Sequence, residues 1–379
     1  MITQTEQTLY RLSMLDAAQE KISYQMSTGK KLQNGSDDSE LYARQLYVDD
    51  KIRMYEGLET QIQKTNAQNN VADSTIGEIK SILEFVKSEM IKANTSTTTD
   101  EGLKAIAVNV EGMKQNLLDL ANTQIEGEYL FAGSDSSIRP FSEDSSGKVN
   151  YDGDNQLRKV AVEDGSYRQR GVNGYDVMYY PTSTAYKGEE LTFTADSKIF
   201  DEQGMQWKLN GSNDTLEQYD FDGNLTVNQI TGVVGDGNSP ETFTAIAPVD
   251  DGTKLIAKTS IFDVIDTVVN SLNKVDSNGN PISEEDAKAG ISKGVDDIGD
   301  AYDGVNVAHA DLGGRNRVFE VSLERVSSKL TQFNVLSTEI GAADLSKVAI
   351  EAKALELTYT ALYSTINRTS QLSLVNFIR

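Results

Sequence analysis

Apolar side chains recur every three to four residues near both ends of the chain, from Leu9 to about Leu120 and from about Ile291 to Phe377. This spacing places them on one stripe of an α-helix. The middle of the chain loses the spacing. The pattern therefore predicts one helical bundle built from both ends of the chain, with the middle carried as an insertion.

Two helices are predicted in the amino-terminal part. The first covers about residues 5–26 and stops at Gly29. After a polar stretch, Asp37 and Asp38 stand where a helix N-terminus favours acidic, capping side chains. The second helix keeps a seam of spacing three and four from Leu41 to Met90. Its fifty residues would make a rod of about 75 Å.

Two polar residues, Thr65 and Asn69, interrupt the apolar seam of the second predicted helix. Two interpretations are open. The simpler one is a core that is locally hydrated. The other is a notch that receives a partner.

Four more helices follow from the same spacing. A capping box of Thr98 and Glu101 predicts the start of the third helix. Near the carboxyl end, a helix is predicted from Ile261 to about Leu272, and a longer one from about Ser283 to beyond Phe333. The seam of the longer helix stays in phase across the doublet of glycines at 313–314, so we expect the helix to continue through it. The last helix is predicted over residues 345–377.

From Ile125 the spacing of apolar residues changes to two, which is typical of β-strands. Tight-turn dipeptides punctuate this region and predict short strands joined by tight turns. They are Asp152-Gly153, Asp164-Gly165, Asn173-Gly174, Asn210-Gly211, Asp222-Gly223, Asp236-Gly237 and Asp251-Gly252. We expect Trp207 to anchor the core of a small β-domain here rather than to stack on a ligand.

The predicted fold class is α+β, mainly α with an inserted β-rich region. Long coiled-coil helices from both termini form a bundle, to which a β-hairpin and an outer β-domain are added. We place a terminal coiled-coil domain at residues 1–35 and 345–379. A helical rod domain with the hairpin takes residues 36–169 and 256–344, and the outer domain takes residues 170–255.

Composition removes several classes of function. The formal net charge is -23, which opposes binding to nucleic acid phosphates or to an anionic membrane surface. The chain contains no cysteine, so a thiolate nucleophile and Cys-ligated metal are excluded. The first twenty residues hold three acidic side chains and no apolar run, so we expect no cleaved secretory signal. No window approaches the roughly 18 apolar residues of a membrane span.

Two segments have features of a chemical site. The run from Asp276 to Asn280 begins like a calcium loop, but Pro281 stands where glycine is needed and Ala287 where the bidentate Glu belongs. Turn chemistry is the simpler interpretation. His309, the single histidine, lies in a helical run without the spacing of a catalytic triad. We therefore predict no catalytic residue, no metal site, no cofactor and no enzyme activity.

The two terminal helices carry the functional prediction. Each has an apolar stripe with no obvious partner in the chain except the other stripe, and isolated helices of this length are marginal. We expect the two stripes to become ordered when several copies pack together, so that they form an assembly surface. Its predicted residues are Leu9, Leu12, Leu15, Ile22, Met26, Leu355, Leu362, Ile366, Leu372, Val375 and Phe377.

Several motifs carry a resemblance to a known family. They are residues 27–32 followed by Asp37-Asp38, residues 127–134, Arg139-Pro140-Phe141, residues 151–154, residues 172–177 and the helical end from Ser327 to Arg379. This series resembles the hook-associated proteins at the hook–filament junction, which belong to the bacterial flagellin family. The resemblance covers roughly residues 1–180 and 260–379 and is weak over residues 181–255.

The resemblance implies a structural axial protein of the bacterial flagellum, exported by the type III apparatus of the flagellum without a cleaved signal. Its implied partners are hook-associated protein 1, flagellin, further copies of the chain in a ring and an export chaperone, with no nucleic acid and no membrane. Two alternatives stay open. One is flagellin itself, and the other, from a different class, is an extracellular enzyme or carbohydrate-binding module on the outer β-domain.

Overall fold

The computed structural model describes residues 2–95, 98–237, 241–247 and 254–377 of the chain, with side chains at the two ends described over residues 6–368 only. It consists of two compact units. One contains Met1–Thr60 and Glu324–Arg379, and the other is Gln61–Leu323. The three domain ranges expected from the sequence stay a prediction.

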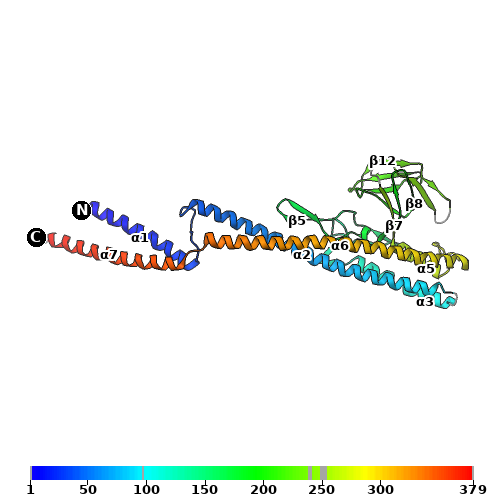
Figure 1. Cartoon of the computed structure of the whole chain (residues 1–379), viewed down its shortest axis with the longest axis horizontal. Helices are drawn as coiled ribbons and strands as arrows, with labels where there is room; N and C mark the ends of the chain where they lie inside the picture. Colours follow the sequence, from blue (N-terminus) through cyan, green and yellow to red (C-terminus); the bar gives the residue numbers. More distant parts are fainter. Residues whose placement is uncertain (1, 96–97, 238–240, 248–253, 378–379) are drawn as a thin grey trace. The chain divides into compact units, whose positions relative to one another are not determined.

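Within the described residues, six long helices lie where the apolar spacing predicts them, and Figure 1 shows them with the inserted strands. They are α1 (Ile2–Thr28), α2 (Ser39–Ala93), α3 (Asp100–Ala121), α5 (Ile261–Leu272), α6 (Glu284–Gly341) and α7 (Leu345–Phe377), and a short helix, α4 (Gly174–Val177), lies between strands. The prediction of a mainly α chain with an inserted β-rich region is confirmed.

The helix α6 passes through Gly313 and Gly314 without a break, as the phase of its seam predicts. A Cβ atom added at either glycine would meet no heavy atom within 4 Å. These glycines therefore mark neither a turn nor a close helix contact.

Helix starts are set by side-chain caps, and one of the two predicted starts needs correction. At α2, Asp38 Oδ1 accepts the backbone N–H of Leu41 at 3.0 Å, as expected. At α3, the prediction that Thr98 is the cap is wrong, because the N-cap is Thr99, whose Oγ1 accepts from Gly102 N at 3.2 Å. The hydroxyl of Thr98 instead donates to the carbonyl of Lys92 at the end of α2, at 2.8 Å.

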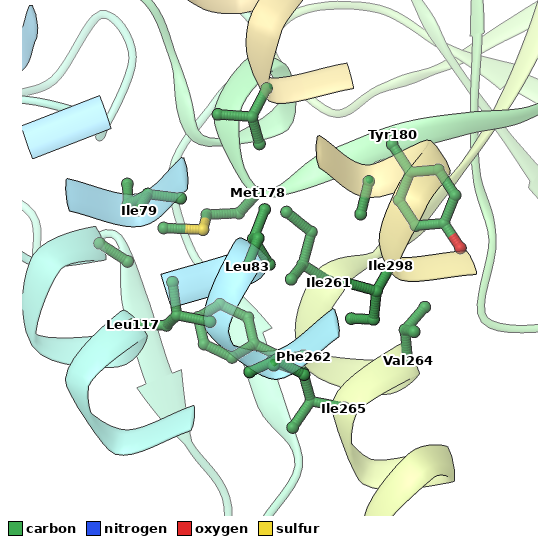
Figure 2. Close-up of a cluster of buried hydrophobic side chains, with 14 of the residues drawn as sticks. Ile79, Leu83, Leu117, Met178, Tyr180, Ile261, Phe262, Val264, Ile265 and Ile298 are labelled. Atoms are coloured by element: carbon green, nitrogen blue, oxygen red, sulfur yellow. The ribbon is translucent and has the colours of Figure 1, made fainter. Parts of the chain in front are cut away.

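The core of the Gln61–Leu323 unit is apolar and draws on all of its long helices. Side chains of α2, α3, α5 and α6 meet there with residues next to α4. Figure 2 shows part of this cluster, with Ile79, Leu83, Leu117, Met178, Tyr180, Ile261, Phe262, Val264, Ile265 and Ile298 labelled. Close packing of this kind places the inserted strands against a rigid base.

The described strands of the inserted region form two larger sheets. The six-stranded sheet has the order β12-β11-β10-β9-β15-β7, and the three-stranded sheet has the order β13-β14-β8. Their strands are β7 (Tyr179–Tyr186), β8 (Glu190–Thr194), β9 (Lys198–Asp201), β10 (Gln206–Leu209), β11 (Thr215–Tyr219), β12 (Leu225–Thr231), β13 (Val234–Gly235), β14 (Thr242–Ile246) and β15 (Lys254–Ser260).

Trp207 lies in the core of this β-domain, as predicted. Its side chain packs in a cluster with residues such as Leu191, Leu216 and Phe243. Its indole Nε1 donates to Asp201 Oδ2 at 3.1 Å. The buried indole is thus both packed and hydrogen-bonded, which satisfies its polar atom.

In the part of the chain that the structure describes, three antiparallel hairpins precede the larger sheets. They are β1 (Gln124–Ile125) with β2 (Glu128–Tyr129), β3 (Phe141–Glu143) with β4 (Val149–Tyr151), and β5 (Lys159–Glu163) with β6 (Ser166–Gln169). The turn at Asp164-Gly165 joins β5 to β6 as predicted.

The remaining predicted turns divide into three groups. The dipeptides at 210–211, 222–223 and 236–237 lie between paired strands and confirm the prediction. Asp152-Gly153 follows β4 without making a hairpin, and Asn173 caps α4 by accepting from Asp176 N, so these two turn predictions are wrong. Asn suits a helix cap as well as a turn, because in both its side chain forms a hydrogen bond with the backbone a few residues later. The dipeptide at 251–252 lies outside the described residues.

Candidate assembly surface

The helix α1 ends in a turn that ties it to the connection between α6 and α7. Gly29 has a φ of +67°, a left-handed conformation that favours glycine, and its N–H donates to the carbonyl of Gln25 at 2.9 Å. Beyond it, Lys31 N donates to the carbonyl of Gly341 at 2.7 Å, and Ala343 N donates to the carbonyl of Gly29 at 2.8 Å. These bonds fix the point from which α1 and α7 leave together.

A small buried group surrounds this connection. Leu32, Ile340 and Val348 are all buried. Gln25 is buried as well, and its side-chain N–H donates to the carbonyl of Lys31 at 2.7 Å. The base of the terminal helix pair therefore has its own local core.

Beyond this base, α1 and α7 lie side by side (Figure 1). The Tyr359 hydroxyl donates to Asp16 Oδ1, which links the two helices at mid-length. This hydrogen bond to the Asp16 carboxylate raises the pKa of Tyr359 to about 12. The protonated phenol donates to the carboxylate, and the carboxylate in turn disfavours ionisation of the phenol.

A groove of about 710 Å³ runs between the two helices. It is lined by Gln19, Ile22, Ser23, Met26 and Ser27 from α1, and by Ala352, Leu355, Glu356, Tyr359, Thr360 and Tyr363 from α7. The rings of Tyr359 and Tyr363 stack with their centroids 6.3 Å apart. The groove is therefore largely apolar, with aromatic surface on one side.

Much of the apolar surface of the pair is exposed, both in the groove and outside it. Side chains that expose more than half of their surface are found along both helices. They are Leu9, Tyr10, Met14 and Met26 on α1, and Leu345, Ile350, Leu357 and Tyr363 on α7. Exposed apolar side chains concentrated on one helix pair are typical of interaction sites.

The structure brings together only part of the predicted surface. Ile22, Met26 and Leu355 line the groove, whereas Leu12, Leu15, Leu362 and Ile366 are half-buried along the pair and Leu9 is exposed. The side chains of Leu372, Val375 and Phe377 lie outside the described residues. That these residues form an assembly surface stays a prediction.

Sequence reasoning missed the aromatic part of the groove. Tyr359 is absent from the predicted surface residues, and its phenol also makes a polar contact with Asp16. Tyr363 lies off the stripe, and its position four residues after Tyr359 is the one available hint, because residues so spaced are neighbours on a helix.

A charged cluster in the Gln61–Leu323 unit was also missed. The carboxylate of Glu128 on β2 accepts hydrogen bonds from Arg170, Arg158 and Gln68 at 2.8, 3.0 and 3.0 Å. Burial opposes its ionisation, but the bonds and positive charges of the arginines outweigh burial and lower the pKa of Glu128 to about 2. The cluster holds the first hairpin against α2, and its members are too far apart in sequence for spacing to reveal it.

The other candidate residues have structural partners. His309 Nε2 lies 2.9 Å from Asp73 Oδ1, and Asp276 Oδ1 accepts the N–H groups of Asn278 and Asn280 within its own turn, each at 2.8 Å. The part of the chain that the structure describes contains no group of three or more His, Cys, Asp or Glu arranged to hold a metal. Within that same part, none of the helices has the length and hydropathy to cross a membrane.

Comparison with known proteins places this fold in context. Residues 3–136 match the bacterial flagellin N-terminal helical region. Flagellar hook-associated protein 3 of Escherichia coli K12 is 29% identical over 168 residues, which are 44% of this chain and 51% of that protein. The same protein of Salmonella typhimurium LT2 is 26% identical over 183 residues, 48% of this chain and 56% of that protein. These matches span about half the length of each relative.

The crystal structure of flagellar hook-associated protein-3 from Legionella pneumophila superposes with a TM-score of 0.52. It is 20% identical to this chain, of which it covers 78%, and 98% of its own length is matched. At this identity the likeness concerns the fold. Residues 3–136 are thus similar to the N-terminal helical region of bacterial flagellins, and the chain is similar to flagellar hook-associated protein 3, which confirms the resemblance predicted from its motifs.

Proposed function

We propose that this chain is a structural axial protein of the bacterial flagellum that joins hook-associated protein 1 to the flagellin filament and is required for filament assembly. The apolar groove and the outward apolar side chains of α1 and α7 carry the proposal. A helix pair that stays this exposed within one chain gains burial only when other chains cover it.

The proposed partners follow from the resemblance and from this surface. Further copies of the chain form a ring through α1 and α7, with hook-associated protein 1 on one side and flagellin on the other. An export chaperone covers the same helices before assembly. We place the protein in the extracellular flagellum, exported by the flagellar type III apparatus without a cleaved signal, and assign it no enzyme activity.

The substitution Leu362→Asp tests the proposal. Leu362 is half-buried on α7, in the unit Met1–Thr60 with Glu324–Arg379. An aspartate there leaves the melting of the Gln61–Leu323 unit unchanged, but places an unpaired charge in the assembled core. Cells that carry only this variant should lack filaments and release flagellin as monomer into the medium.

The matched control is Ser364→Asp, which adds the same charge two residues away at an exposed position. It should leave filaments in place. Normal filaments on cells with Leu362→Asp would show that this stripe is not the assembly surface. Unlimited polymerisation of the pure wild-type protein would favour the alternative, flagellin itself, because a junction protein should await its neighbours.

A further inference from the structure

Two neighbouring amide side chains on α2 are buried, and each has one polar atom without a hydrogen-bond partner among the described residues. Gln68 is 3% exposed and Asn69 is 2% exposed. Gln68 Oε1 and Asn69 Nδ2 have no hydrogen-bond partner among the described residues. Buried polar atoms in native proteins are paired, with protein or with ordered water, in the great majority of cases.

The orientation of the Gln68 amide is determined by its surroundings. Its Nε2 donates to Glu128 Oε2 at 3.0 Å. If the nitrogen and oxygen of this amide were exchanged, the amide oxygen would face the ionised carboxylate of Glu128. Two hydrogen-bond acceptors would then repel each other. Gln68 Oε1 is therefore an acceptor that needs a donor from elsewhere, whereas Asn69 Nδ2 is a donor that needs an acceptor.

Both residues line one small cavity of about 20 Å³. Its other walls include Tyr129 and Gly133, which belong to and follow the first hairpin, and Arg158 and Arg170, which flank the hairpin of β5 and β6. A water molecule requires roughly 10–15 Å³ of such space and two to four polar partners. The cavity meets both conditions for one water.

We propose that this cavity is a binding site for one structural water, which donates to Gln68 Oε1 and accepts from Asn69 Nδ2. An anion is disfavoured, because the Glu128 carboxylate already pairs with both arginines at this site. An apolar ligand would leave both amides unpaired. The polar interruption of the α2 seam at Asn69 is thus a hydrated core and not a notch for a partner.

The water has a defined structural task. Arg170 N donates to the carbonyl of Arg158 at 2.9 Å, so the two ends of the β5–β6 hairpin are joined at the cavity wall. A water held by α2 at this point links the helix to the base of the hairpin. This contact adds to the one that the chain itself makes through Glu128, whose carboxylate binds Gln68 of α2 and both arginines at the ends of the hairpin.

Water-to-amide Overhauser spectra of the full-length protein, labelled with ¹⁵N in Asn and Gln, test the proposal. The wild type should show negative cross-peaks between water and the side-chain amides of Gln68 and Asn69, as expected for a water that stays bound longer than the protein tumbles. Asn69→Leu, which fills the cavity and removes one partner, should abolish these peaks at Gln68. Asn70→Leu, the same change at the exposed neighbouring position, should preserve them.

The wild-type protein alone can overturn the proposal. A high-resolution crystal structure should contain density for a water about 2.5–3.0 Å from Gln68 Oε1. A dry cavity in that map, or the absence of the negative cross-peaks, would refute the site even if Asn69→Leu failed to fold. Peaks that persist in a folded Asn69→Leu variant would place the water elsewhere.

Discussion

At the scale of single residues, Glu128 shows how one side chain can organise several segments. Its carboxylate accepts hydrogen bonds from Arg170, Arg158 and Gln68, which come from three different parts of the chain. Because its pKa falls from 4.5 to about 2, the native state holds the charged form more strongly than the unfolded state does. The stability that it contributes is complete above about pH 4.5 and is lost as the pH falls towards 2.

Glu128→Gln is therefore expected to destabilise the Gln61–Leu323 unit by about 2 kcal/mol near pH 7, a figure reduced from the pKa shift because the carboxylate is partly exposed. The difference from wild type should shrink below about pH 4.5 and vanish near pH 2. Urea unfolding at several pH values measures this. A difference that stays constant with pH would mean that the shape of the side chain, and not its charge, matters.

Asp263, in the first turn of α5, should behave in the opposite way. Burial raises its pKa from 3.8 to about 6, despite the nearby positive charge of Lys148. The native state then binds a proton more tightly than the unfolded state, so stability falls as the pH rises from about 4 to 6. Asp263→Asn should raise the stability near pH 7 by about 1–2 kcal/mol and change it little below pH 4. Thermal melting of the variant and of the wild type at both pH values tests this. A variant that is less stable than the wild type near pH 7 would contradict the prediction.

At the scale of elements, the long helix α6 makes a clear prediction. Because a Cβ at Gly313 meets no neighbour, Gly313→Ala should stabilise the protein by about 0.5–1 kcal/mol by restricting the unfolded chain. Gly304 in the same helix provides the contrast, since a Cβ there would lie 2.7 Å from Tyr180 Cβ and 3.3 Å from Tyr180 Cα. Gly304→Ala should destabilise. Equal effects of the two substitutions, measured by urea unfolding, would contradict this account.

The helices could be predicted from sequence because their information is local. The apolar phase on either side of Gly313 and Gly314 suffices to place α6, and the stripe of α7 gives its extent. Strand order depends on distant segments: β15 lies between β9 and β7, and no dipeptide turn specifies that. The candidate groove was found only in part for the same reason, since the contact of Asp16 with Tyr359 joins residues at opposite ends of the sequence.

At the scale of the whole molecule, the two compact units differ in how they are stabilised. The Gln61–Leu323 unit has an extended apolar core. The other unit has a few buried contacts, among them the stacked rings of Tyr55 and Phe333, whose centroids lie 5.5 Å apart, and its terminal helices expose much apolar surface. Segments with few buried contacts open at lower free energy than the core does.

We therefore expect α1 and α7 to exchange their backbone amide hydrogens, and to be cut by proteases, well before α3 in a dilute solution of the monomer. Hydrogen exchange followed by mass spectrometry distinguishes the helices by peptide. If the amides of α1 and α7 were as protected as those of α3, the terminal pair would be stable by itself. It would then need no partners to become ordered.

The pairing of β7 with β15 has a consequence for how this chain can diverge. Tyr179 stands opposite Ser260 and Tyr186 opposite Lys254, so the inserted strands leave and rejoin the helical base through two adjacent strands. Ser260 then caps α5 directly by accepting from Phe262 N. Because the two attachment points are neighbours, the loops within the segment from 187 to 253 can lengthen or shrink in evolution without moving a helix. Phe200 of β9 is the exception to this independence, since it packs on Tyr175 in the helical core. A foreign domain is therefore best inserted into one of these loops, with β9 kept in place.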